Sequence, residues 1–216
     1  RAGVQDEGSQ LVVKAATSAG FPAGPWLDLC AGPGGKSALL RGLAPGLLVS
    51  AELQPHRAEL VGRALRAYRQ AGADGRAHQV IVADGRVPAW QARAFSLVLA
   101  DVPCTGLGSL RRRPESRWRR DPGGLGQLVE LQAGLLAAAI ESTGPGGVVA
   151  YVTCSPHRAE TVDVVAGARG VQLLDAPALL PEVPAAASRL NRRCIQLWPH
   201  IHGTDAMFCA LLRRDR

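Results

Sequence analysis

Short apolar runs alternate with longer stretches of helical spacing along most of the chain. Five runs are rich in Val, Leu and Ile and are bounded by Gly, Pro or Asp, as buried strands are. They lie at 26–30, 47–53, 79–83, 95–102 and 147–153. The stretches with Ala, Leu and Arg at helical spacing lie at 36–43, 55–71 and 125–141. This alternation predicts βαβ units, and therefore a parallel α/β sheet with helices on both faces.

Two further apolar runs close the chain, at 195–198 and 206–212, and the segment PHIHGTD joins them. An antiparallel strand pair is the simplest interpretation of this pattern. The seven runs together predict a mostly parallel seven-stranded sheet that ends in an antiparallel pair. Residues 1–20 are predicted to be a helical lead-in, in which Ser9 can cap a helix. Residues 21–216 are predicted to form one domain.

Composition and charge narrow the class of partner. The chain has 216 residues, of which 47% are hydrophobic, enough for the core of one α/β domain. The formal net charge of +7 favours a polyanionic partner such as a nucleic acid. No apolar run approaches the roughly 20 residues that a membrane helix needs, so a membrane is not expected as a partner. Since Met207 is the only methionine, we expect a fragment of a longer protein.

The cysteines indicate a cytoplasmic protein with reduced thiols. Their number is odd, they are widely spaced, and none forms a Cys-x-x-Cys pair, which fits neither a disulfide framework nor a zinc site. They are Cys30, Cys104, Cys154, Cys194 and Cys209. The pair His200 and His202 has no evident third ligand, so no metal is expected.

A glycine-rich loop follows the first predicted strand and opens a helix, over the residues DLCAGPGGKS from Asp28 to Ser37. Three glycines in such a turn let a ligand lie against the backbone. A phosphate-binding loop of the Walker type needs glycine where Cys30 stands, which disfavours a nucleotide hydrolase. A dinucleotide fingerprint that starts at Gly32 needs glycine or alanine at Ser37, and also fails.

Acidic residues follow the next three predicted strands. Glu52 can accept hydrogen bonds from ribose hydroxyls, Asp84 can meet the amine of an adenine, and Asp101 lies beside the expected reacting centre. Ligands of open α/β sheets bind at this edge, where the carboxyl ends of the strands converge. A ribose acid beside a loop without phosphate-binding spacing suits an adenosine ligand that lacks phosphates. S-adenosylmethionine is such a ligand.

Two cysteines are predicted to meet at the same edge. Cys104 follows the fourth strand in the motif DVPCT, and Cys154 follows the fifth in the motif TCSP. Carbon-5 of cytosine is a poor nucleophile, but a thiolate that adds to carbon-6 makes it reactive enough to accept a methyl group. A base must then remove the carbon-5 proton. Asp101 is placed to stabilise the adduct near ring nitrogen 3.

Six segments share the motifs of one enzyme family, and they lie at 4–10, 30–36, 101–105, 111–120, 151–156 and 197–205. Through them the chain resembles the catalytic domain of the RsmB/Sun/Fmu family of RNA cytosine-5 methyltransferases nearly end to end. The resemblance implies the Rossmann-like class I S-adenosylmethionine-dependent methyltransferase fold and 16S ribosomal RNA as the substrate. It also implies an upstream RNA-binding domain. Three mild departures are Glu52, where relatives often have aspartate, Gly32, where alanine is common, and Val102, which replaces a frequent alanine.

The resemblance also assigns roles to site residues. Cys154 is implied as the nucleophile and Cys104 as the residue that helps to release the product. The cofactor-binding residues that it implies are Cys30, Ala31, Gly32, Pro33, Gly34, Gly35, Lys36, Glu52, Asp84 and Asp101. Since DNA cytosine methyltransferases attack with the Pro-Cys cysteine, Cys104 remains an alternative nucleophile. A tRNA substrate and a non-catalytic RNA-binding domain also remain open, although intact Cys104, Cys154 and Asp101 argue against lost catalysis.

A basic segment follows the Cys104 motif and is predicted to be a loop over the substrate cleft. Arginine binds phosphate through two parallel donors, and a tryptophan offers a stacking face to an unpaired base. The candidate RNA-binding residues are Arg111, Arg112, Arg113, Arg117, Trp118, Arg119 and Arg120. The alternative for this segment is a solvated charged loop without a ligand. We expect the protein to be a monomer.

Overall fold

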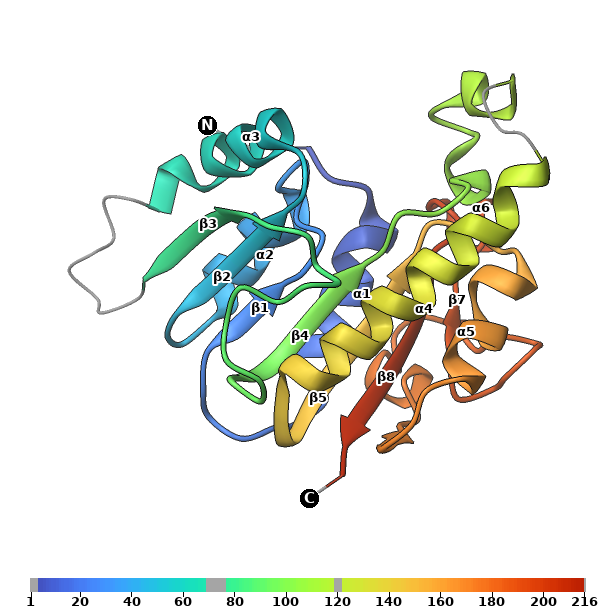
Figure 1. Ribbon diagram of the computed structural model, residues 1–216. Coiled ribbons are helices and arrows are strands. Elements are labelled where there is room, and N and C mark those ends of the chain that lie inside the picture. Colours follow the sequence, from blue (N-terminus) through green and yellow to red (C-terminus); the bar gives the residue numbers. More distant parts are fainter. Residues whose placement is uncertain (1–3, 69–76, 119–121, 216) are drawn as a thin grey trace.

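The computed structural model describes residues 4–68, 77–118 and 122–215, and a twisted sheet forms its centre (Figure 1). The order of strands across the sheet is β3-β2-β1-β4-β5-β8-β6, and β7 also pairs with β8. The strands are β1 (Trp26–Asp28), β2 (Leu48–Glu52), β3 (His78–Val82), β4 (Phe95–Asp101), β5 (Thr143–Thr153), β6 (Val171–Leu173), β7 (Ile195–Gln196) and β8 (Phe208–Arg214).

The pairing pattern confirms the predicted fold class. β1 to β5 pair in parallel, whereas β8 runs antiparallel to β5, β6 and β7. β6 was not predicted, because Val171–Leu173 is interrupted by a glutamine and its apolar run is shorter than those that mark the other strands. The parallel register brings the ends of β1, β2, β4 and β5 to one edge of the sheet. Every loop that carries a candidate residue leaves the sheet at or near that edge.

Helices cover both faces of the sheet, as predicted (Figure 1). They are α1 (Glu7–Thr17), α2 (Gly35–Leu43), α3 (Pro55–Ala64), α4 (Leu125–Ser142), α5 (Val162–Ala166) and α6 (Pro199–His202). Side chains of β4 alternate between the two faces: Leu97 packs with Val12 of α1, and Val98 packs in the cluster that holds Leu135 of α4. This is the two-residue period of a strand buried on both sides. None of the helices in the described part of the chain is long and apolar enough to span a bilayer.

Two element boundaries differ from the expectation. The predicted helix over 55–71 is α-helical only to Ala64 and continues as a 3-10 turn to Tyr68; its last residues lie outside the described part. The predicted helical lead-in is α1, and its N-cap is Asp6, whose carboxylate accepts from the backbone N–H of Gly8. Ser9, expected as a cap, instead lies near the Lys36 ammonium, with Oγ 3.4 Å from Nζ.

Candidate active site

The two cysteines predicted to meet do so at the edge where β4 and β5 end. Cys104 lies three residues after β4, Cys154 directly follows β5, and their sulfur atoms are 3.4 Å apart. Gly108 holds the two loops close, because its N–H donates to the Cys154 carbonyl and its own carbonyl accepts from the Ala206 N–H. A Cβ atom on Gly108 would lie 2.3 Å from the Ala206 carbonyl oxygen, so only glycine fits there.

The surroundings of the two thiols favour a thiolate at Cys154. The hydrogen bond from the Cys104 thiol lowers the pKa of Cys154, against the effects of burial and of the Asp101 charge, and the Lys36 ammonium lowers it further. The same hydrogen bond, with burial, raises the pKa of Cys104 well above its usual value. These opposite shifts make Cys154 the more acidic of the two thiols. A thiolate is the nucleophilic form of cysteine.

An ion pair borders the cysteines on the cofactor-loop side. Lys36, in the first turn of α2, places its Nζ 2.7 Å from Oδ2 of Asp101 at the end of β4. The lysine side chain is only 12% exposed, whereas Asp101 keeps 27% of its side chain in contact with solvent. The exposed part of the carboxylate can therefore face a substrate that enters beside Cys154.

The glycine loop between β1 and α2 closes around Glu52. The Glu52 carboxylate is almost fully buried and accepts from the backbone N–H groups of Gly32 and Gln54, each at 3.0 Å. A Cβ atom on Gly32 would lie 2.3 Å from Oε2 of Glu52. Gly34 has a φ of 109°, and a Cβ there would meet Cα of Val61 at 2.9 Å. Gly34 is therefore required by its backbone, whereas a side chain at residue 32 would have to displace the ends of the Glu52 and Arg57 side chains.

The other residues of the predicted cofactor set lie around this loop. Cys30, Ala31 and Pro33 complete the turn into α2, where Ala31 packs against α3. Asp84 follows β3 and pairs with Arg86, with Nη2 2.7 Å from Oδ2. The Arg86 guanidinium, through its hydrogen bonds, holds the pKa of Asp84 below its usual value. In the described structure the acid expected at the adenine thus binds an arginine of its own loop.

The loop also fits the methionine end of S-adenosylmethionine. The buried Nε2 atom of Gln5 has no hydrogen-bond partner within the described residues. It lies 3.6 Å from where a Cβ on Gly35 would be, at the N-terminus of α2. Helix N-termini favour anions such as carboxylates. Gln5, Gly35 and Lys36 could hold the methionine carboxylate, and Glu52 could accept from the ribose hydroxyls.

The structure divides the predicted RNA-binding residues into two groups. Arg111 and Arg112 both bind Asp6 and Asp205, two carboxylates whose side chains are only 2% exposed. These arginines tie the loop to the start of α1 and to the segment before β8. Arg119 and Arg120 lie outside the described residues.

The remaining predicted RNA-binding residues point to solvent. Arg113 and Arg117 are exposed, and the Trp118 side chain is 82% exposed. The Arg117 guanidinium lies over the Trp118 ring, 5.9 Å from its centroid. This 3-10 turn (Pro114–Trp118) and Arg113 just before it offer an aromatic face and two cations to a ligand.

Sequence reasoning missed a buried carboxylate beside the cysteines. Glu160 accepts hydrogen bonds from Thr105, Gln132 and Ser155. Glu160 lies in a short 3-10 turn with no hydrophobic period, so its burial was not evident. The sequence signal for a buried polar partner was Gln132, because it is an amide among Leu and Ala residues on the buried side of α4.

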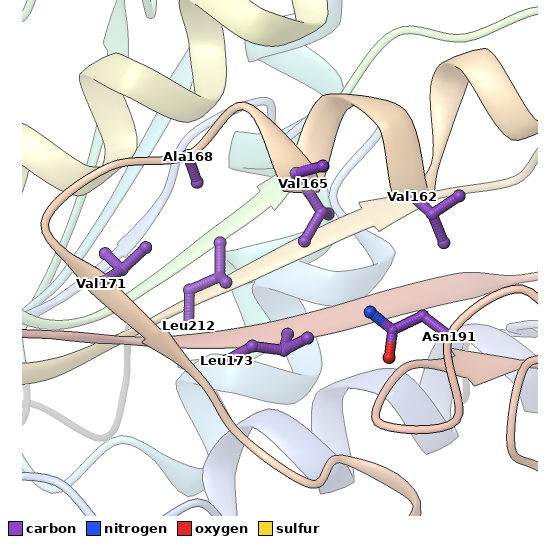
Figure 2. A pocket seen from close by; sticks show the side chains of 8 residues that line it. Val162, Val165, Ala168, Val171, Leu173, Asn191 and Leu212 are labelled. Carbon is purple, nitrogen blue, oxygen red and sulfur yellow. The ribbon is translucent and has the colours of Figure 1, made fainter.

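An apolar depression with a volume of about 210 Å³ lies between α5, β6 and β8 (Figure 2). It is lined by Val162, Val165, Ala166, Ala168, Val171, Leu173, Asn191 and Leu212. None of the candidate catalytic or cofactor residues lines it, and Asn191 is the only polar side chain. Over the described parts of the chain, no group of three His, Cys, Asp or Glu residues is arranged to hold a metal ion.

Buried Asp28, under the cofactor loop, predicts a pH-dependent stability. Burial raises its pKa from 3.8 to about 7, although Ser37 donates a hydrogen bond to it. Between pH 4 and 7 the unfolded chain loses this proton and the folded protein keeps it, so the free energy of unfolding falls as pH rises. Asp28→Asn cannot ionise. The free energy of unfolding of Asp28→Asn minus that of the wild type should therefore be about 2–3 kcal/mol larger at pH 8 than at pH 5, as measured by urea unfolding. Equal differences at the two pH values would contradict the assignment.

The fold and this site define a class I S-adenosylmethionine-dependent methyltransferase. A family model described as 16S rRNA methyltransferase RsmB/F matches residues 21–213. The chain therefore belongs to the RsmB/F family of 16S rRNA methyltransferases.

Individual relatives agree with this family. A protein of Mycobacterium tuberculosis (strain H37Rv), described as a candidate methyltransferase, is 51% identical over 98% of this chain and 46% of its own length. The ribosomal RNA small subunit methyltransferase B of Pseudomonas syringae pv. tomato is 32% identical over 97% of this chain and 46% of its own length. The chain thus spans about half the length of these relatives.

A solved structure has the same fold. The crystal structure of NSun6 from Pyrococcus horikoshii with SFG superposes with a TM-score of 0.79, at 23% identity over 98% of this chain and 53% of that one.

Proposed function

We propose that this chain transfers a methyl group from S-adenosylmethionine to carbon-5 of a cytosine in 16S ribosomal RNA, with Cys154 as the nucleophile. The observation that carries the proposal is the 3.4 Å contact between the Cys104 and Cys154 sulfurs, in which Cys154 has the lowered pKa. The Lys36–Asp101 pair beside them supplies an acid and a carboxylate. Membership of an rRNA methyltransferase family and the charge of +7 favour RNA as the substrate.

The first step is the addition of the Cys154 thiolate to carbon-6 of the cytosine. The sulfur–carbon bond forms, the 5,6 double bond opens, and ring nitrogen 3 takes up a proton. The Lys36 ammonium can give up one proton, and Asp101, with which it is paired, exposes a carboxylate edge to the substrate. We assign Asp101 to ring nitrogen 3 and Lys36 to the supply of that proton. Carbon-5 thereby becomes an enamine carbon.

In the second step, S-adenosylmethionine would supply a methyl group to carbon-5 when bound, and its sulfonium sulfur would keep the electron pair of the broken sulfur–methyl bond, which leaves a neutral thioether. Once Cys154 is bonded to carbon-6, the negative charge that raised the pKa of Cys104 is gone. Cys104 can then lose its proton to solvent and remove the proton from carbon-5. The sulfur–carbon bond breaks, nitrogen 3 returns its proton, and the Cys154 thiolate is restored. One proton is released per methyl group.

The experiment that tests this function is bisulfite mapping of cellular RNA, with and without the full-length gene. We expect protection of a cytosine in 16S rRNA that disappears on deletion and returns with the wild-type gene, but not with Cys154→Ala. If protection is lost only in tRNA, the substrate is tRNA and not 16S rRNA. Unchanged cytosine protection in all RNA would overturn the proposal, and so would full rescue by Cys154→Ala.

The exposed turn predicts a contribution to RNA affinity. Trp118→Ala should weaken RNA binding by roughly 1–3 kcal/mol, because stacking of one base on an aromatic ring has about this value. Fluorescence anisotropy with an unmodified rRNA fragment measures the loss, and the melting temperature should not change. Arg112→Ala is the matched contrast, since it removes one of the two arginines that pair with the buried Asp205 and should lower the melting temperature. If Trp118→Ala and the wild type bind RNA equally well, this turn is a solvated loop that does not contact RNA.

A further inference from the structure

Glu160 is a fully buried carboxylate at the end of the turn that follows β5. Its Oε1 atom accepts from the Thr105 backbone N–H at 2.8 Å and from Nε2 of Gln132 at 3.0 Å. Its Oε2 atom accepts from the hydroxyls of Thr105 and Ser155, each at 2.6 Å. A single side chain thus receives four hydrogen bonds from three different segments.

The donors are the immediate neighbours of the two cysteines. Thr105 follows Cys104 and Ser155 follows Cys154, so Glu160 joins the two loops one residue beyond each sulfur. Gln132 of α4 extends the link, because its Nε2 also donates to the carbonyl of Pro103, on the other side of Cys104.

The backbone of Glu160 is also hydrogen-bonded to the central sheet. The Tyr151 hydroxyl, buried in β5, donates to the Glu160 carbonyl at 2.8 Å. The carboxylate is therefore anchored to the sheet, and it holds the loops relative to a fixed element rather than only to each other.

A carboxylate suits this place because all four contacts are donors to it. It offers lone pairs on both oxygens, whereas the amide of glutamine would turn one acceptor into an N–H₂ group facing donors. Although burial opposes it, these hydrogen bonds hold the pKa of Glu160 below its usual value, which keeps the charge. That charge is also one of the causes of the raised pKa of Cys104.

We propose that Glu160 is a positioning residue that sets the separation of the Cys104 and Cys154 sulfurs. The catalytic meaning of that separation rests on the proposed function; the separation itself does not. When Glu160 is replaced, the loops after β4 and β5 keep the Gly108 hydrogen bond but lose the anchor nearest the two sulfurs, and we expect the sulfurs to move apart. Displacements of about 1 Å in a reacting group can cost on the order of a hundredfold in rate.

The test uses Glu160→Gln with Glu130→Gln as the matched control, because Glu130 is an exposed glutamate on α4. The first readout needs no RNA: diamide, which accepts two hydrogens, oxidises the two thiols to a disulfide at a rate that depends on their separation. Peptide mapping by mass spectrometry follows the Cys104–Cys154 pair. In Glu160→Gln we expect this rate to fall by about tenfold or more, in line with the loss of preorganised geometry. It should stay at the wild-type value in Glu130→Gln.

The second readout is methyl transfer. In Glu160→Gln, kcat should fall by on the order of a hundredfold while KM for S-adenosylmethionine stays within about twofold, because Glu160 does not touch the cofactor loop. If Glu160→Gln does not fold, Thr105→Val removes one of the four hydrogen bonds at nearly constant volume and should slow disulfide formation. Wild-type disulfide rates in a folded Glu160→Gln, or in Thr105→Val, overturn the proposal. If the wild-type protein methylates no RNA, the proposed function fails while the disulfide rates still decide the role of Glu160.

Discussion

Cys154→Ala is expected to abolish methyl transfer, with a fall in kcat of at least about 10⁴-fold, because no other group replaces a nucleophile. Carbon-5 of cytosine does not react with a sulfonium methyl until a sulfur is bonded to carbon-6. The Cys104 thiol is not expected to substitute, since it stays buried in this variant, which raises its pKa, and it is assigned to the carbon-5 proton rather than to carbon-6. Incorporation of tritiated methyl groups into unmodified 16S rRNA measures the loss.

The affinity for S-adenosylmethionine should change by less than about twofold in Cys154→Ala, since the cofactor loop is a separate segment between β1 and α2. Isothermal titration measures this Kd. Cys209→Ala is the control, because Cys209 is a buried thiol of β8 that packs in the core. It should keep turnover while losing some stability. Normal turnover by Cys154→Ala would remove this cysteine from the mechanism.

The meeting of the two cysteines could be predicted because it depends on topology alone. Parallel neighbouring strands end at the same edge of a sheet, so residues just after β4 and β5 must lie close. The runs of Val, Leu and Ile that reveal these strands are long and well bounded. The short strand β6 has no such signal, and only its pairing with β8 defines it.

Other parts of the site depend on contacts between residues far apart in the chain. Arg111 and Arg112 have the sequence pattern of a solvated or RNA-binding loop, yet both bind Asp6 and Asp205, which lie near opposite ends of the chain. The role of Glu160 is hidden for the same reason, since Thr105 is 55 positions away. A charge run therefore predicts exposure well only where no buried acid is brought to it by the fold.

Glu52 and Gly32, two of the departures from the family pattern, are in direct contact. The longer side chain of Glu52 reaches back to the Gly32 N–H, and its Oε2 atom lies only 2.3 Å from where a Cβ on residue 32 would be. The alanine that is common in relatives would displace this carboxylate. The glutamate and the glycine thus complement each other in volume, and the acid stays at the edge of the sheet where the ribose is expected.

Cys104→Ala is expected to accumulate a covalent protein–RNA adduct. Cys154 can still add to carbon-6 and carbon-5 can still accept the methyl group, but the base assigned to the carbon-5 proton is missing. Turnover should fall by roughly 10²–10⁴-fold, the usual contribution of a general base. The adduct should appear as an RNA-shifted band on denaturing gels when S-adenosylmethionine is present.

The double variant Cys104→Ala, Cys154→Ala distinguishes the two thiols. It should form no adduct, because the sulfur that makes the bond is absent, and comparison with Cys104→Ala assigns the band to Cys154. If Cys104→Ala formed no adduct while Cys154→Ala did, Cys104 would be the attacking thiol and the roles would be exchanged. The lowered pKa of Cys154 and the raised pKa of Cys104 favour Cys154 as the attacking thiol.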